Sequence, residues 1–515
     1  MNRYICIHSH FYQPPRENPW LEKIERQESA YPYHDWNERI THECYLPYAE
    51  SPILGADGDN IKIINNYSKT NFNFGPTLLS WIKKRKPDLY NTIINTDKES
   101  RKIFSGHGQA IAQVYNHIIM PLANERDKQT QVVWGIKHFE HHFGRTPEGM
   151  WLAETAVDIK TLEVVAEYGI KFTILAPRQA KCIRELGGNE WIDVNNERID
   201  SKNVYLCRLP SGKSINIFFY DGSISNGIAF GGLLHNGEHF AERLITAFSD
   251  ENNNQLVNIA TDGETFGHHQ RYGNMALAYC IYHIEKHNLA KFTVYGEYLE
   301  KFPPLYEAQI VENSSWSCAH GIERWRSNCG CNAGTNSEWS QEWREPLRNA
   351  FDWLRNKLIA IYEEEAAQLV NDPWIARNKY IDLMMDKSSR GLNLFLEKHG
   401  RKQLSEKETY KVLQLLEMQK FAMFMYTSCG WFFDDVSRIE TIQNMQCAAR
   451  SIMLAKEICG VNMEEEFLNL LKLAPSNVSD FQTGDIVYKM LVKPTIPEKP
   501  NLELQELFFN PEMLD

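Results

Sequence analysis

The chain has 515 residues, and its 55 Lys and Arg against 67 Asp and Glu give a formal net charge of −12 at pH 7. This mildly acidic balance leaves no basic surplus to neutralise phosphates, so we expect no nucleic acid partner. No apolar run approaches the ~18 residues that span a bilayer, and the N-terminal stretch lacks the apolar segment of a signal peptide. We therefore expect a cytoplasmic protein without a membrane partner, and the odd number of 11 cysteines favours reduced thiols.

Short runs of β-branched and aromatic residues alternate with longer helical patterns over roughly the first 300 residues. The seven predicted strands are Tyr4–Ile7, Asn71–Phe74, Lys102–Phe104, Gly149–Leu152, Phe172–Leu175, Ile215–Tyr220 and Val257–Thr261. Most of them are followed by a helix-like segment, and such alternation predicts a parallel α/β sheet or barrel.

Helices in this part are predicted from apolar spacing and from end signals. Pro76 suits the first position of a helix, residues 132–143 place apolar side chains near one face before Gly144, and Met275–His287 has a similar pattern.

The character of the chain changes after a Trp- and Cys-rich stretch at residues 314–343. Long amphipathic helices are predicted there, with an N-cap at Asp372 before Pro373 and a capping box of Ser405 and Glu408. They span Pro346–Val370, Pro373–Lys398, Glu406–Tyr426 and Val436–Ile458. We therefore predict a barrel at residues 1–310, a helical domain at 311–475 that completes the cleft, and an extended, proline-rich arm at 476–515.

Two acids end apolar strands in a way that suggests chemistry. In a parallel barrel the carboxyl ends of the strands converge on one mouth, and Glu154 and Asp262 each follow a predicted strand. A pair of carboxylates is what glycosyl transfer requires, one to attack or position water and one to protonate the leaving oxygen. Glu264 is the rival of Asp262, because alternate residues share a face if the strand continues.

Histidines near the same strand ends allow a second interpretation. His8, His10 and His107 together with Asp262 could hold zinc, as in a metal-dependent carbohydrate deacetylase. The simpler reading, which we favour, is that the imidazoles bind sugar hydroxyls or the catalytic acids, with no metal.

Two further groups of residues are candidates for binding. Trp316 and Trp431 lie among polar turn-forming residues and could stack on a sugar face. Cys318 and His320 with Cys329 and Cys331 supply four zinc-capable ligands, but the one-residue gaps are tighter than ordinary zinc hooks and favour buried or cleft-lining thiols.

Four segments carry a family resemblance. They are His8-Ser9-His10 with Gln13-Pro14-Pro15, Ser105-Gly106-His107-Gly108-Gln109, Gly149-Met150-Trp151-Leu152-Ala153-Glu154 and Thr261-Asp262-Gly263-Glu264. In this order they resemble motifs of glycoside hydrolase family 57, and the resemblance extends to about Ile458. It implies an incomplete (β/α)7 barrel followed by an all-α helical domain, and retaining chemistry on an α-glucan substrate with no metal and no cofactor.

The resemblance also implies residue roles. Glu154 would be the nucleophile that forms a covalent glycosyl-enzyme, and Asp262 would be the general acid and base. His10 and Trp151 would contact substrate. The stretch from Trp316 through His320 to Trp325 resembles the start of the helical region that completes the cleft in one subgroup.

Two departures from the family motifs leave the exact activity open. Phe11 and Tyr12 separate the second histidine from Gln13, and Ala153 replaces a common proline. Neither removes a catalytic group, but amylases, 4-α-glucanotransferases, branching enzymes and α-galactosidases of the family share the acids and differ in loops. We expect an amylase-like hydrolase of α-1,4-glucans, with a glucanotransferase or branching enzyme as the alternative. A non-catalytic glycan-binding protein is a third possibility, against which the retention of both acids argues.

Overall fold

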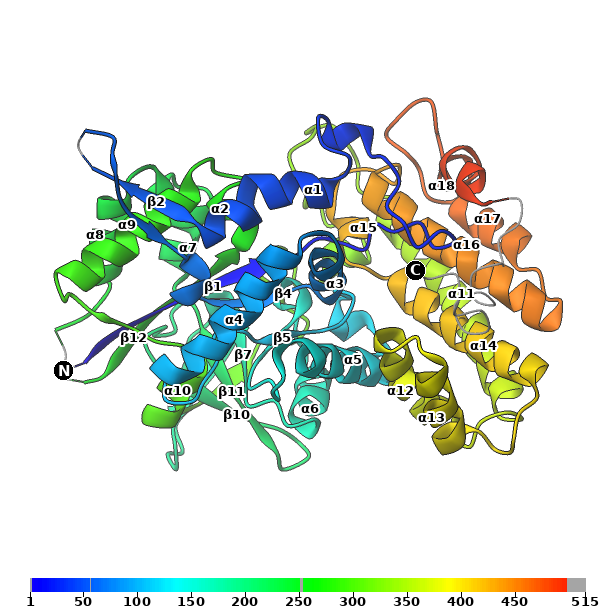
Figure 1. Ribbon diagram of the computed structural model, residues 1–515, viewed down its shortest axis with the longest axis horizontal. Helices are drawn as coiled ribbons and strands as arrows, with labels where there is room; N and C mark the ends of the chain where they lie inside the picture. Colours follow the sequence, from blue (N-terminus) through cyan, green and yellow to red (C-terminus); the bar gives the residue numbers. More distant parts are fainter. Residues whose placement is uncertain (1, 56, 251–252, 498–515) are drawn as a thin grey trace. The chain divides into compact units, whose positions relative to one another are not determined.

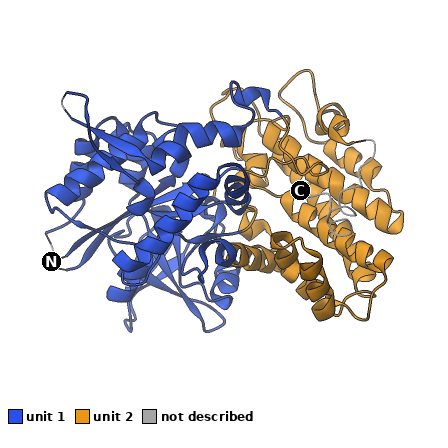
Figure 2. Ribbon diagram, in the orientation of Figure 1, with its two compact units in different colours: residues 1–13, 26–114, 139–317 blue, residues 14–25, 115–138, 318–515 orange. Residues whose placement is uncertain are grey.

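A computed structural model describes residues 2–55, 57–250 and 253–497 (Figure 1). The chain divides into two compact units (Figure 2). An α/β unit comprises residues 1–13, 26–114 and 139–317, and a helical unit comprises residues 14–25, 115–138 and 318–515. Among the helices of the described residues, none is both long and apolar enough to cross a membrane.

The centre of the α/β unit is β1 (Arg3–Phe11), which has parallel neighbours on both sides. It pairs with β12 (Gln255–Asp262) and β4 (Asn71–Phe74), and its first residues pair with β13 (Lys291–Phe292). Its side chains are almost all buried, as expected for a strand in a parallel sheet covered on both faces.

Short parallel pairings extend this arrangement. A bridge from Phe72 to Ala110 leads toward β5 (Ala112–Gln113), which pairs with β6 (Met150–Trp151). A bridge from Gly149 to Phe172 leads to β7 (Phe172–Leu175), which pairs with β11 (Ser214–Phe219). Parallel neighbours thus follow the order β12-β1-β4-β5-β6-β7-β11. No ladder between β11 and β12 closes a barrel in the described part of the chain, so the α/β architecture is confirmed and a closed barrel is not present.

The remaining strands form side structures. A six-stranded sheet runs in the order β7-β11-β10-β14-β8-β9, and a separate hairpin pairs β2 with β3. Their bounds are β2 (Ser51–Leu54), β3 (Asn60–Ile64), β8 (Ala180–Glu185), β9 (Ile192–Asp193), β10 (Val204–Arg208) and β14 (Tyr306–Ile310).

One predicted strand is wrong. Lys102–Phe104 lies at the end of α4 (Pro87–Ile103), whose buried face includes Leu89 and Ile93. The short apolar run there is the last turn of an amphipathic helix, which periodicity over three residues cannot distinguish from a strand. The strand in this region is β5, which has two residues and neither a β-branched nor an aromatic side chain.

Helices of the α/β unit cover and connect the strands. Pro76 is the first residue of α3, as predicted. Their bounds are α1 (Trp36–Ile40), α2 (Leu46–Ala49), α3 (Pro76–Arg85), α6 (Ile159–Glu167), α7 (Gly222–Ala229), α8 (Gly237–Ile245), α9 (Gly273–Lys286) and α10 (Tyr295–Lys301). Helix α5 (Glu125–Phe143) contains the predicted face at 132–143, and its first part belongs to the helical unit.

The helical unit is built on long helices that lie side by side (Figure 1). Helices α11 and α16 both contact α14. Their bounds are α11 (Arg344–Ala366), α12 (Pro373–Met385), α13 (Ser389–His399), α14 (Glu406–Phe424), α15 (Cys429–Phe432), α16 (Ile439–Cys459), α17 (Glu464–Leu471) and α18 (Gly484–Val487). The all-α character of this part of the chain is therefore confirmed.

The local capping signals are confirmed, and one helix boundary was missed. Asp372 accepts hydrogen bonds at the start of α12, and Ser405 forms a capping box with Glu408 at the start of α14. The predicted helix 373–398 is two helices, because Ser388 caps a new one at α13.

The extended arm predicted at 476–515 is partly helical. Residues 484–495 form α18 and two further short helical turns, which bury Val487, Tyr488 and Val492. These residues are buried by contacts with other parts of the fold. The spacing of the prolines, from which the extended arm was predicted, contains no information about such contacts. The end of the predicted arm, 498–515, lies outside the described residues.

Candidate active site

The carboxyl end of β1 carries two buried histidines. The register of β1 and β4 pairs His8 with Asn71 and His10 with Asn73. The Nδ1 of His8 lies 2.6 Å from Asn71 Oδ1, and its Nε2 lies 3.0 Å from Asn73 Oδ1. Burial lowers the pKa of His8 to about 4, so the ring is neutral near pH 7.

Amide groups continue this polar network across the neighbouring strands. Asn73 Nδ2 lies 2.9 Å from His10 Nδ1 and donates a hydrogen bond of 2.8 Å to Gln113 Oε1 on β5. Residues from β1, β4 and β5 are therefore joined at the carboxyl ends of their strands, where parallel α/β sheets place their sites.

Trp151, at the end of β6, packs against both histidines. Its ring is stacked on His8 and on His10, with centroids 4.8 Å apart in each case. Trp316 meets Trp151 edge to face at 5.0 Å and His10 at 6.3 Å. Trp151 is fully buried, whereas Trp316 is partly exposed, so Trp316 offers the accessible surface of this aromatic cluster.

Glu154 lies in a short turn, Ala153–Thr155, directly after β6. Its backbone is left-handed, with φ of 57°, a conformation that non-glycine residues adopt rarely and that is found at functional sites. Its Oε2 accepts hydrogen bonds from the indole Nε1 of Trp316 at 3.0 Å and from the hydroxyl of Ser317. These donors stabilise the ionised carboxylate, and the side chain remains partly exposed.

Asp262, the last residue of β12, also belongs to the α/β unit, and only a minor part of the residue is exposed. Burial of the carboxyl, followed by the negative charges of Glu264 and Glu154, raises its pKa well above the ordinary value. The two acids are thus near enough to interact electrostatically, and their environments differ. Glu154 is stabilised by hydrogen-bond donors, whereas Asp262 is held toward its protonated form.

Glu264 is buried beside Asp262 and has protein partners of its own. Its Oε1 accepts hydrogen bonds from the hydroxyl of Tyr45 at 2.6 Å and from the backbone N–H of Tyr12 at 2.9 Å. Burial raises the pKa of Glu264 to about 7. The residue is 5% exposed, which leaves little of its side chain for a substrate to contact, and its charge contributes to the raised pKa of Asp262.

His107 does not join these residues. Its Nδ1 lies 2.8 Å from Glu148 and its Nε2 lies 2.6 Å from Glu300, on α10. The sequence predicts a strand just before His107, but the element there is the helix α4, so His107 comes before β5 rather than after a strand. His8, His10, His107 and Asp262, the set that a zinc deacetylase would need, do not form a group that could hold a metal ion among the described residues, and His107 is instead bonded to Glu148 and Glu300.

Three predicted binding residues belong to the helical unit. Trp325 and Trp431 are fully buried in its core and expose no ring face to a sugar. Trp431 packs under the guanidinium of Arg348 and edge to face with Phe351. His320 is exposed and lies in a cluster with three cysteines. Trp325 ends the short turn η9 (Glu323–Trp325) and Trp431 lies in the four-residue helix α15. A large aromatic residue in such a short element is as suited to a core as to a cleft, and sequence spacing alone does not separate these cases.

The sequence reasoning missed several members of the site. Asn71, Asn73 and Gln113 complete the network around the histidines, and Ser317 donates to Glu154. The alternation Asn71-Phe72-Asn73-Phe74 is a signal that could have been used, since it puts both amides on one face of a strand. Nothing in the sequence links Tyr45 to Glu264.

Comparison with known proteins gives two family matches and several similar proteins. Residues 4–310 match the family model Glycosyl hydrolase family 57, and residues 339–505 match one described as Domain of unknown function (DUF3536). A segment of 107 residues is 30% identical to Alpha-amylase 1 of Dictyoglomus thermophilum. This alignment covers 20% of the present chain and only 14% of that amylase.

Solved structures show the same fold over most of the chain. An exo-type maltose-forming amylase from Pyrococcus sp. ST04 superposes with a TM-score of 0.69 at 17% identity, covering 92% of this chain and 83% of its own. A branching enzyme from Pyrococcus horikoshii superposes with a TM-score of 0.54 at 13% identity, covering 96% and 97%. Because one family model spans well over half of the sequence, the chain belongs to glycosyl hydrolase family 57.

Proposed function

We propose that the chain is a retaining glycosidase that acts on α-1,4-glucans, in the manner of an amylase. The main support for this proposal is the pair of acids Glu154 and Asp262, which lie in one unit and are near enough to interact electrostatically. Hydrogen-bond donors stabilise Glu154 as a carboxylate, whereas the surroundings of Asp262 favour its protonated form. Family membership and the named activities of the similar proteins support α-glucan as the substrate class.

In the first step of the proposed reaction, Glu154 attacks the anomeric carbon of the bound sugar. The bond from this carbon to the glycosidic oxygen breaks, and Asp262 gives its proton to the departing oxygen. The raised pKa of Asp262 suits this role, because burial and the neighbouring negative charges favour the protonated form that a general acid needs.

In the second step the glycosyl-enzyme is hydrolysed. Asp262, now a carboxylate, takes a proton from water, and the water oxygen attacks the anomeric carbon and releases Glu154. Two inversions give net retention of the α-configuration. If a sugar hydroxyl replaces water as the acceptor, the same residues perform glucanotransfer or branching.

Aromatic and polar groups beside Glu154 would hold the sugar. Trp316 is partly exposed and donates to Glu154 through its Nε1, so its ring is suited to stack on the pyranose that the carboxylate attacks. His10 meets Trp316 and is linked to Asn73, so it can donate to or accept from a sugar hydroxyl in a defined orientation.

The test combines product analysis with variants of the two acids. Full-length protein is incubated with amylose, maltoheptaose and glycogen, and product lengths and the anomer first released are followed by chromatography and NMR. We expect short α-anomeric maltosaccharides from the wild type, and loss of turnover by at least about 10³-fold in both Glu154→Gln and Asp262→Asn. The Glu300→Gln variant, which changes an exposed carboxylate on α10, is the control and should retain activity.

Each outcome has a defined meaning. Release of the β-anomer would contradict the retaining mechanism, and full activity in either acid variant would overturn its assignment. Redistribution of chain lengths without net reducing ends would assign glucanotransfer, and new branch points would assign branching.

A further inference from the structure

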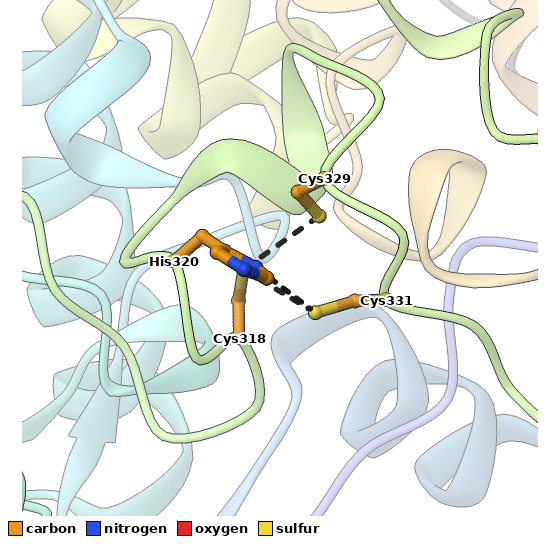
Figure 3. A group of neighbouring side chains, drawn as sticks. All are labelled: Cys318, His320, Cys329 and Cys331. Carbon is orange, nitrogen blue, oxygen red and sulfur yellow. Dashed lines mark hydrogen bonds between the residues drawn. The ribbon is translucent and has the colours of Figure 1, made fainter.

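Four metal-ligand side chains meet in the helical unit, and none of them is an acid or ring of the candidate active site. Cys318, His320, Cys329 and Cys331 each offer one ligand atom, and these atoms all lie within 4.8 Å of one another. Figure 3 shows the four side chains gathered around one point. We propose that this cluster is a structural zinc site, with three cysteine thiolates and one histidine nitrogen as ligands.

The distances between the ligand atoms match those of a tetrahedral zinc centre. Zn–S bonds of about 2.3 Å place two sulfurs about 3.8 Å apart, and a Zn–N bond of about 2.0 Å places sulfur and nitrogen about 3.5 Å apart. The Sγ of Cys318 lies 3.9 Å from that of Cys329 and 3.8 Å from that of Cys331. The Sγ of Cys331 lies 3.6 Å from Nδ1 of His320.

The same distances argue against a disulfide. A disulfide requires sulfurs about 2.05 Å apart, and all of these cysteines are free thiols in the structure. Three sulfurs and an imidazole nitrogen at mutual ligand distances satisfy a metal ion with four positions, whereas a disulfide would use two sulfurs and leave the others without a role.

The local backbone explains how one-residue gaps can hold a metal. Gly330, between Cys329 and Cys331, has φ of +78°, so the chain turns there and brings both thiols to the same side. Between Cys318 and His320 a tight turn is closed by a hydrogen bond of 3.1 Å from the Gly321 N–H to the Cys318 carbonyl. The short spacing that appeared unfavourable in the sequence is therefore compatible with a zinc hook.

A buried cation next to the sulfurs provides an independent indication. Arg344, the first residue of α11, is fully buried, and its Nη1 lies 3.8 Å from Cys329 Sγ and 2.8 Å from the carbonyl oxygen of Cys331. Within the described part of the chain, it makes no ion pair with a carboxylate at 4.0 Å or less. Three thiolates and Zn²⁺ would carry a net charge of −1, and this charge, together with the nearby buried carboxylate of Asp434, would stabilise the buried guanidinium.

The position of the cluster indicates what zinc would do. Between the end of β14 at Ile310 and the start of α11 at Arg344, the only regular element in the described chain is the three-residue turn η9 (Glu323–Trp325). Loops of this length with so little secondary structure are uncommon in compact domains, and a metal ion bound by four of its residues would tie this one together. Four protein ligands leave no open coordination position, which is the arrangement of structural rather than catalytic zinc.

Metal analysis of the full-length protein tests the proposal directly. The protein is expressed without a polyhistidine tag, kept reduced, dialysed, and measured for zinc, iron, nickel, copper and cobalt by plasma mass spectrometry. We expect about one zinc per chain, and X-ray absorption at the zinc edge should fit three sulfurs at about 2.3 Å and one nitrogen at about 2.0 Å.

Matched cysteine variants locate the ion. Cys331→Ser should lower bound zinc to below about 0.1 per chain. Cys459→Ser is the control, because Cys459 lies at the end of α16 and its Sγ hydrogen-bonds to the Ala455 carbonyl, a bond that a serine hydroxyl also makes. This variant should retain the full zinc content. Chelation of the wild-type protein should lower its Tm, and added zinc should restore it.

The zinc content of the wild-type protein does not depend on whether any variant folds, so this measurement alone can refute the proposal. Less than about 0.1 zinc per chain after reduction and incubation with zinc salt would overturn it, and so would stoichiometric iron in place of zinc. Loss of zinc from Cys459→Ser but not from Cys331→Ser would place the ion elsewhere and would also overturn it.

Discussion

Replacement of Glu264 by glutamine should stabilise the protein, and more so at high pH. The pKa of this buried carboxyl is about 7 against an ordinary value of 4.5. Between these values the native protein binds a proton that the unfolded chain has lost, so stability of the wild type falls as pH rises through this window. Each unit of difference between the native and unfolded pKa corresponds to about 1.4 kcal/mol. The ionised Glu264 therefore lowers the free energy of unfolding of the wild type by about 3 kcal/mol above pH 7.

Glutamine preserves the hydrogen-bonding role of the side chain while removing its charge. An amide oxygen can still accept from the Tyr45 hydroxyl and from the Tyr12 N–H, so the local structure should be retained. We therefore expect the Tm of Glu264→Gln to exceed that of the wild type by roughly 5 °C at pH 8, with a much smaller difference at pH 5. Differential scanning calorimetry at the two pH values measures this.

The same variant should also change the pH dependence of turnover. The negative charge of Glu264 is one of the causes that raise the pKa of Asp262. Its removal lowers that pKa, so the alkaline limb of the kcat profile should move to lower pH if Asp262 is the general acid. A purely structural role for Glu264 would not move this limb.

Glu148→Gln serves as a control, because the expected change in stability at pH 8 has the opposite sign from that of Glu264→Gln. Burial alone would raise the pKa of Glu148, but hydrogen bonds and charge from Lys171 and His107 hold it below the ordinary value. Removal of this carboxylate should therefore destabilise the protein at pH 8. The reasoning about Glu264 would be refuted by an equal change in Tm at pH 5 and pH 8, or by a shift of the alkaline limb to higher pH.

Three further changes test the site and the helical unit. Ser317→Ala removes a donor to the carboxylate of Glu154 and should lower kcat about 10- to 100-fold, as expected for a hydrogen bond to a charged group; a kcat within twofold of wild type would contradict this. Asp262→Asn should raise the Tm at pH 8 while turnover is lost, because burial and neighbouring acids disfavour the ionised form; a lower Tm at pH 8 would count against that environment. Ser405→Ala breaks the capping box with Glu408 and should cost about 1 kcal/mol in the stability of the helical unit without loss of kcat, as followed by thermal unfolding.

The proposed roles of the two acids depend on contacts that differ between them. Glu154 is approached by an indole N–H and a hydroxyl, both from the segment of Trp316 and Ser317. Asp262 interacts electrostatically with the carboxylates of Glu264 and Glu154. A carboxylate held by hydrogen-bond donors beside a second acid whose pKa is raised is the arrangement that acid–nucleophile chemistry uses.

Local sequence determined those features that depend on near neighbours. Strand Phe172–Leu175 and strand Asn71–Phe74 were predicted with their observed bounds, and the caps at Asp372 and Ser405 formed as their side chains indicated. The strand-end positions of Glu154 and Asp262 were likewise readable, because each follows an apolar run directly. Interactions between residues that are close in sequence can be predicted from the local sequence pattern.

Tertiary structure alone decided which distant residues meet. The register of β1 and β4 brings His10 to Asn73, and the fold buries Trp431 in a core. It also separates His107 from His8 and gathers Cys318 with Cys331. Such encounters depend on strand pairing and on the packing of faces formed by segments far apart in sequence, and no local pattern encodes the partner that a side chain will find.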